Sequence, residues 1–96
     1  MLDVYLGSRH SELCLQLCER DFAGRWELVE FLQRHGIPFD FYRDFQIDAE
    51  RAEALARHLA TALVSPLNRE SPAMLALYAL LLKSALQGQA LYFVGD

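Results

Sequence analysis

Residues 48–64 read DAERAEALARHLATALV, and this stretch decides the fold class because its periodicity is the clearest in the chain. Apolar side chains recur at the three- and four-residue spacing of one helix face, and polar side chains occupy the opposite face. The expected buried positions are Ala52, Leu55, Ala56, Leu59, Ala62 and Leu63, and the expected solvent-facing positions are Glu50, Glu53, Arg57 and Thr61. The stretch therefore predicts an α-helix over residues 49–64, capped by the carboxylate of Asp48.

A second helix is predicted downstream, over residues 72–87. Ser71 is a suitable N-cap, and Pro72 fits the first helical position, where its missing N–H costs nothing. Gly88 follows the last apolar residue and is expected to end the helix. The helix is apolar nearly all round, which is typical of a central helix covered on several sides.

Upstream, the spacing predicts two more helices. The first covers about residues 8–20, with Ser8 as its N-cap. Its proposed buried face consists of His10, Leu13, Cys14, Leu17 and Cys18. The second begins at Asp21 or Gly24 and ends at Gly36.

Trp26 lies near the start of that second upstream helix. We expect it to anchor the core rather than a binding site, because its apolar area is large.

Three segments are expected to be extended. Residues 4–6 predict a short strand, and residues 39–47 alternate aromatic and polar side chains, which favours one or two short strands or an extended aromatic segment. Residues 91–94 predict a closing strand that pairs with either of the other two. The sequence thus predicts a single α+β domain over residues 1–96, predominantly helical, with about four helices and two or three short strands.

Composition narrows the class of function. The chain is 53% hydrophobic, which argues against intrinsic disorder, and its formal net charge of −4 disfavours a nucleic-acid partner. Its first residues lack the basic and apolar regions of a signal peptide. Its longest apolar run, residues 73–82, is about half of the ~20 residues that a membrane span needs. We therefore expect a cytoplasmic protein that does not enter a membrane.

Few residues suggest chemistry. His10, Cys14 and Cys18 have a spacing that zinc could use, but a fourth ligand and paired Cys-x-x-Cys motifs are missing. Buried, unreactive cysteines are the commoner alternative. A nucleophile elbow, a cysteine-protease signature and a phosphate-binding glycine loop are also missing from the sequence. The sequence therefore predicts a protein that is not an enzyme and needs no cofactor or metal.

The most informative cluster of charges lies in residues 37–53, which hold five of the 13 acidic residues and two of the nine basic ones. One interpretation is a solvated face with a helix cap. The other is an acidic docking surface flanked by aromatic residues, since interfaces favour Tyr and Arg at their energetic centres. The candidate partner-binding residues are Asp40, Tyr42, Arg43, Asp44, Asp48, Glu50 and Glu53.

The segments Glu30–Gly36 (EFLQRHG) and Ile47–Ala56 (IDAERAEALA), with the aromatic segment between them, resemble a pattern of small bacterial immunity proteins. Ile37-Pro38 departs from that pattern, which has a second small residue there. The resemblance implies a small cytoplasmic protein that binds a cognate toxin stoichiometrically and carries no catalytic groups. The alternative is a structural or regulatory subunit that forms homo-oligomers through its aromatic and Leu-rich surfaces.

Overall fold

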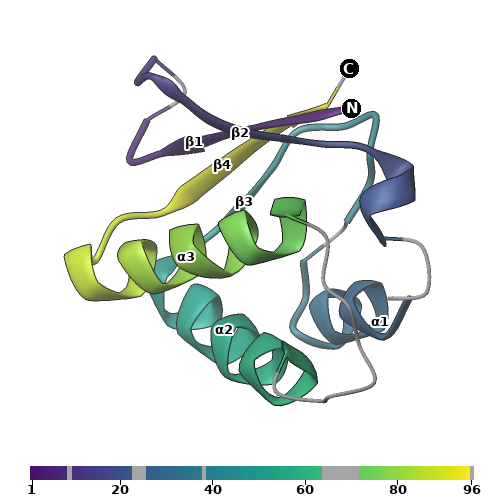
Figure 1. Ribbon diagram of the computed structural model, residues 1–96. Helices are drawn as coiled ribbons and strands as arrows, with labels where there is room; N and C mark the ends of the chain where they lie inside the picture. Colours follow the sequence, from purple (N-terminus) through teal and green to yellow (C-terminus); the bar gives the residue numbers. More distant parts are fainter. Residues whose placement is uncertain (9, 23–25, 38, 64–71, 96) are drawn as a thin grey trace.

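The computed structural model describes residues 1–8, 10–22, 26–37, 39–63 and 72–95, with only the backbone described for residues 26–28, 62 and 63. These residues form four β-strands, three α-helices and one short 3-10 helix. In chain order the elements are β1 (Leu2–Leu6), β2 (Leu13–Leu17), η1 (Glu19–Phe22), α1 (Trp26–Arg34), β3 (Phe45–Ile47), α2 (Ala49–Leu63), α3 (Pro72–Gln87) and β4 (Leu91–Gly95). The helices lie on one side of the sheet (Figure 1).

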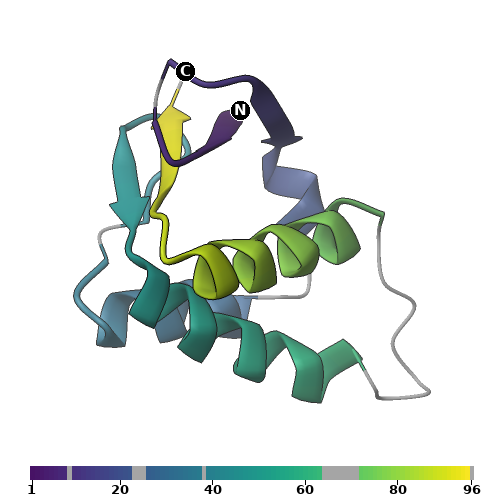
Figure 2. The ribbon, with the colours of Figure 1, turned by 90° about the vertical axis from the view of Figure 1, so that its left-hand side faces the viewer.

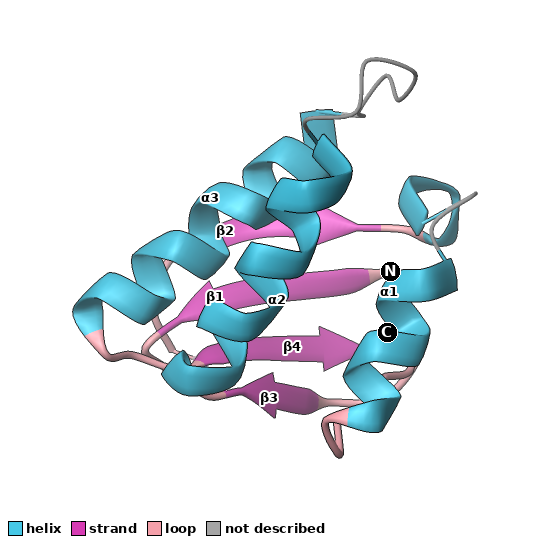
Figure 3. Ribbon diagram, turned by 90° about the horizontal axis from the view of Figure 1, so that it is seen from below, coloured by secondary structure: helices cyan, strands magenta, loops and turns pink. Residues whose placement is uncertain are grey.

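The sheet is antiparallel throughout, with the strand order β2-β1-β4-β3. Its two central strands come from opposite ends of the described chain, since Leu2 pairs with Gly95 and Leu6 pairs with Leu91. On its other side β4 pairs with β3, where Phe45 lies opposite Phe93. The closing strand therefore pairs with both of the segments that the sequence offered as alternatives (Figure 3).

The predicted class of about four helices with two or three strands is wrong, chiefly because residues 8–20 are not a helix. Leu13, Leu15 and Leu17 fit helical spacing only in part, and they also alternate with polar neighbours at the period of a strand. β1 is close enough in sequence to pair with them as a hairpin, and the backbone bonds of that ladder decide the outcome. Ser8 does bond a backbone N–H, that of His10 at 3.1 Å, but it does so within the connecting turn.

The second upstream helix begins later than predicted. α1 starts at Trp26, and η1 occupies the stretch around Asp21. Gly36 ends the helix as expected, with a positive φ of 76° that glycine adopts without steric cost. The alternative start at Gly24 and the Trp26 side chain lie outside the described residues.

The two C-terminal helices match their predicted positions. In α2 the Asp48 carboxylate accepts a hydrogen bond from the Arg51 backbone N–H at 2.8 Å, which is the predicted cap. The predicted apolar stripe is buried at Ala52, Leu55, Ala56 and Leu59, while Ala62, Leu63, Val64 and the proposed Ser71 cap lie outside what can be described. The prediction that α3 is covered on several sides is wrong for one face, where Leu86 is 87% exposed.

The aromatic segment forms less strand than its alternation suggested. Only Phe45–Ile47 pairs into the sheet. The rings of Phe39 and Phe41 turn inward instead and pack around Phe22, with centroids 5.1 and 5.3 Å from it. In this part of the chain, burial of aromatic rings takes the place of hydrogen bonds to a neighbouring strand. The segment crosses the end of the sheet as a bent loop.

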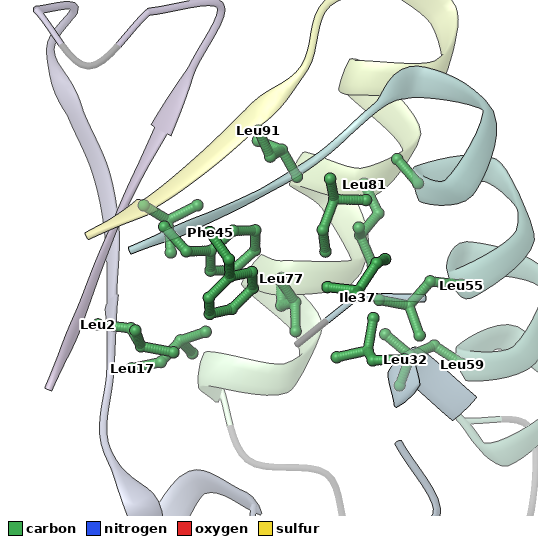
Figure 4. Packing of buried hydrophobic residues seen from close by; sticks show 14 of the residues in the cluster. Leu2, Leu17, Leu32, Ile37, Phe45, Leu55, Leu59, Leu77, Leu81 and Leu91 are labelled. Carbon is green, nitrogen blue, oxygen red and sulfur yellow. The ribbon is translucent and has the colours of Figure 1, made fainter. Parts of the chain in front are cut away.

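One core lies between the sheet and the helices (Figure 4). Alternate residues of the strands face it, and α3 runs between the sheet and much of α2 (Figure 2). The buried apolar residues are Leu2, Val4, Leu17, Phe22, Leu32, Ile37, Phe41, Phe45, Ile47, Ala52, Leu55, Ala56, Leu59, Met74, Leu77, Leu81, Leu91 and Phe93.

Candidate partner-binding site

The loop before β3 carries four of the seven predicted site residues. Buried Phe41 and Phe45 bracket the loop, so the residues between them are held at the surface. Tyr42 is 65% exposed, and Arg43 and Asp44 are also exposed. The core aromatics thus present these side chains to solvent at a fixed position.

Asp40 organises the turn of this loop. Its carboxylate accepts a hydrogen bond from the Tyr42 backbone N–H at 2.8 Å, and its other oxygen lies 3.7 Å from Arg43 Nε. A short acceptor side chain bonding two residues ahead is the usual way in which Asp stabilises a turn. The ion pair with Arg43 is largely exposed, so it contributes little to stability.

Tyr42 reaches across to η1. Its hydroxyl donates a hydrogen bond to Glu19 Oε1 at 2.7 Å, a contact between residues 23 positions apart. This hydrogen bond and the negative charge of Glu19 raise the pKa of the Tyr42 hydroxyl above its ordinary value, with a smaller contribution from Asp40. The phenol therefore ionises at a higher pH than an ordinary tyrosine.

The end of β4 holds the other side of the loop. Asp44 accepts a hydrogen bond from the Gly95 N–H at 3.0 Å. The backbones are so close that a Cβ at Gly95 would overlap backbone atoms of Tyr42 and Arg43. In Figure 1 the bend leading into β3 lies beside η1 and both chain termini. We call the surface group formed by half-buried Asp40 and exposed Glu19, Tyr42, Arg43 and Asp44 the Tyr42 patch.

The structure does not bring all seven predicted residues together. Asp48, Glu50 and Glu53 lie beyond the opposite end of β3, at the start of α2. Glu53 forms an ion pair with Arg57 at 2.7 Å along the exposed face of the helix. The predicted acidic surface is therefore two surfaces separated by a strand.

Asp48 and Glu50 border a polar hollow between the end of α1 and the start of α2. Its volume is about 420 Å³, and Arg34, His35, Asp48, Glu50, Arg51 and Ala54 line it. Cationic and acidic side chains are mixed there, so the hollow does not favour one sign of charge. These acids fit the interpretation of a solvated face with a helix cap, whereas the Tyr42 patch keeps an acidic excess.

Sequence reasoning missed Glu19, the acceptor for Tyr42. Glu19 lies within residues 8–20, which were predicted as a helix that does not form, and the sequence has no local signal that links it to residue 42. Only the packing of η1 beside the aromatic loop brings the two together.

The zinc alternative finds no support in this geometry. Cys14 is exposed on β2, and Cys18 is half-buried with its thiol 3.3 Å from an Asp21 oxygen. The expectation that both cysteines are buried is also wrong. Among the described residues, no group of three or more His, Cys, Asp or Glu side chains could hold a metal ion.

Comparisons with known proteins gave no match. A scan against models of protein families matched none. Searches of curated proteins and of solved structures likewise found no match.

In the part of the chain that the structure describes, none of the helices is both long and apolar enough to cross a membrane.

Proposed function

We propose that this chain is an immunity-type protein, which binds a cognate bacterial toxin stoichiometrically and neutralises it. The observation that carries the proposal is the Tyr42 patch, a largely exposed tyrosine held in place among carboxylates. The resemblance of residues 30–36 and 47–56 to immunity proteins supports the same function.

The patch has the chemistry of a docking site for a basic protein surface. Its three acids and one base give it an excess of negative charge, in a chain whose net charge is −4. Complementary charge speeds the encounter of two proteins, and a tyrosine supplies contact area with few rotatable bonds. Because hydrogen bonds to Glu19 and Gly95 already order the loop, binding loses little conformational freedom.

On this proposal the chain performs no catalysis and needs no cofactor. It acts in the cytoplasm, where it covers the basic active site of a toxin that acts on nucleotides or nucleic acids. Direct binding of nucleic acid by the patch itself is disfavoured, because its carboxylates would repel phosphates.

The first test is capture of the partner with the tagged chain from a lysate of the bacterium that encodes it. The purified partner is then titrated calorimetrically with wild type and with the double variant D40N/D44N, in which the amide oxygens can still accept the two loop hydrogen bonds. We expect at least a tenfold loss of affinity and a weaker dependence of the association rate on salt.

The control is E50Q/E53Q, which removes two charges at the other end of β3 and should leave affinity within about twofold. Equal affinity of D40N/D44N and wild type would rule out the Tyr42 patch as the binding surface. A partner without toxin activity in cells that lack this chain would overturn the immunity function itself.

A further inference from the structure

The exposed face of α3 is apolar and has a regular spacing. Its residues Pro72, Leu75, Ala79, Leu82 and Leu86 follow one another at intervals of three and four. Leu75 is 51% exposed, Leu82 39% and Leu86 87%, while the opposite face buries Met74, Leu77, Leu81 and Ser84. We call these five exposed residues the α3 seam.

An alternating three–four spacing is that of residues that pack between two helices in a coiled coil. A lone surface helix needs only one apolar face toward its own core, and α3 already has that face. The second apolar face has no counterpart within the described residues. An apolar face with this spacing can pack against a helix whose apolar residues have the same spacing, such as α3 of a second copy.

We propose that two copies of this chain associate through antiparallel packing of their α3 seams about a twofold axis at Ala79. The small side chain of Ala79 at the centre lets the backbones approach closely. Lys83 is the single charged residue of α3, and in this arrangement it lies opposite Leu75 of the other copy rather than beside its own counterpart. The seam therefore has no charge repulsion to overcome and no charge that would select a different partner.

Strand β2, which lies beside α3, enlarges the contact between the two copies. α3 packs against β2, which is a terminal strand of the sheet. Figure 3 shows α2 beside α3 on the side toward β3, so the side of α3 away from α2 lies toward the outer edge of β2. Leu13 on β2 is 45% exposed, and the strand has no charged or proline residue of the kind that usually protects a sheet edge.

The available area suits a dimer of modest affinity. A 16-residue helix is about 24 Å long, and a helix with an adjoining sheet layer is about 20 Å deep. Each copy would then bury roughly 500 Å², or about 1,000 Å² in total, which is near the lower limit for a specific interface. We therefore expect a dissociation constant in the micromolar range.

Sedimentation velocity and light scattering on the purified chain, across concentrations from about 1 to 300 μM under reducing conditions, test this arrangement. The weight-average mass should rise with concentration from the monomer mass of 11.0 kDa toward twice that value. The variant A79E should dissociate at least tenfold more readily while keeping the melting temperature of wild type at low concentration. The control Q87E changes an exposed residue of the same helix outside the seam and should dimerise like wild type.

Cross-linking tests the geometry independently. In a C14S/C18S background, A79C should form a disulfide-linked dimer on oxidation, because the twofold axis brings the two thiols together. T61C, exposed on α2, should not. A chain that stays at 11.0 kDa at all concentrations, or equal cross-linking of both variants, would overturn the proposal.

The two proposals fail separately. D40N/D44N should still dimerise, and A79E should still bind the toxin, because the Tyr42 patch and the seam share no residues. A strictly monomeric chain whose A79E variant loses affinity for the captured partner would instead assign the seam to that partner and exclude the dimer.

Discussion

Tyr42 is a largely exposed side chain whose hydroxyl is held by a residue of a different element. Its hydrogen bond with Glu19 joins η1 to the aromatic loop and gives the patch a fixed shape. The buried rings of Phe41 and Phe45, on either side of Tyr42 in sequence, place this stretch at the surface.

The pKa of Tyr42 reports on its hydrogen bond with Glu19. Its pKa in the folded chain is raised above the ordinary value of 10.0, so the stabilising effect is full below pH 10 and is lost as pH rises through the folded-state pKa. We expect ultraviolet absorbance of the phenolate, with Tyr42→Phe as the reference, to show ionisation of Tyr42 above pH 10. Glu19→Gln should lower that midpoint, since it removes the negative charge. An unchanged midpoint would contradict the contact.

The helix α2 shows how far a single element can be read from its sequence. Its cap, its buried stripe and its solvent face could all be predicted, because each depends on residues within four positions of one another. Residues 8–20 could not be assigned in this way. Their leucines satisfy two periods at once, and the choice between them depends on pairing with β1, which the local pattern does not contain.

The cap of α2 can be tested by unfolding in urea. Asp48→Ala removes the acceptor for the Arg51 N–H and should lower the free energy of unfolding by about 1 kcal/mol. Asp48→Asn keeps an acceptor oxygen and should lose only a small part of that amount. Equal losses in both variants would mean that charge, and not the hydrogen bond, gives Asp48 its effect.

At the scale of the whole molecule, α3 has one face in the core and one face exposed to solvent. Leu81 is fully buried beneath the sheet, whereas Leu86, five positions later, is 87% exposed. Pro72 and Gly88 correctly predicted the length of the helix, but its apolar composition could not show which face would remain uncovered. That depends on where α2 and the sheet contact it, and both are placed by the topology of the whole chain.

Alanine substitutions should separate these environments. Leu81→Ala leaves a cavity in the core and should lower the free energy of unfolding by about 2–5 kcal/mol. Leu86→Ala, measured at concentrations where the chain is monomeric, should change it by less than about 0.5 kcal/mol. Calorimetric or urea unfolding of both variants decides this. A large loss for Leu86→Ala in the monomer would contradict the exposed position of its side chain.

In the candidate site, too, the sequence could predict which residues are local neighbours but not which distant residues lie together. Asp40, Tyr42, Arg43 and Asp44 are neighbours in sequence and remain neighbours in space. Asp48, Glu50 and Glu53 were grouped with them by sequence distance alone, and β3 carries them to the other end of the strand. The charge pattern located an acidic segment but could not show that a strand divides it.

The position of β4 between β1 and β3 has a consequence for how the protein is made. β1 and β2 leave the ribosome early, but the inner edge of β1 stays open until residues 91–95 have been synthesised. β3 has no neighbouring strand in the sheet until that moment either. Completion of the sheet is therefore a late, long-range event, of the kind that slows folding. A chain truncated before Leu91 would lose the strand that joins its two halves, and the facing edges of β1 and β3 would keep unpaired backbone N–H and C=O groups.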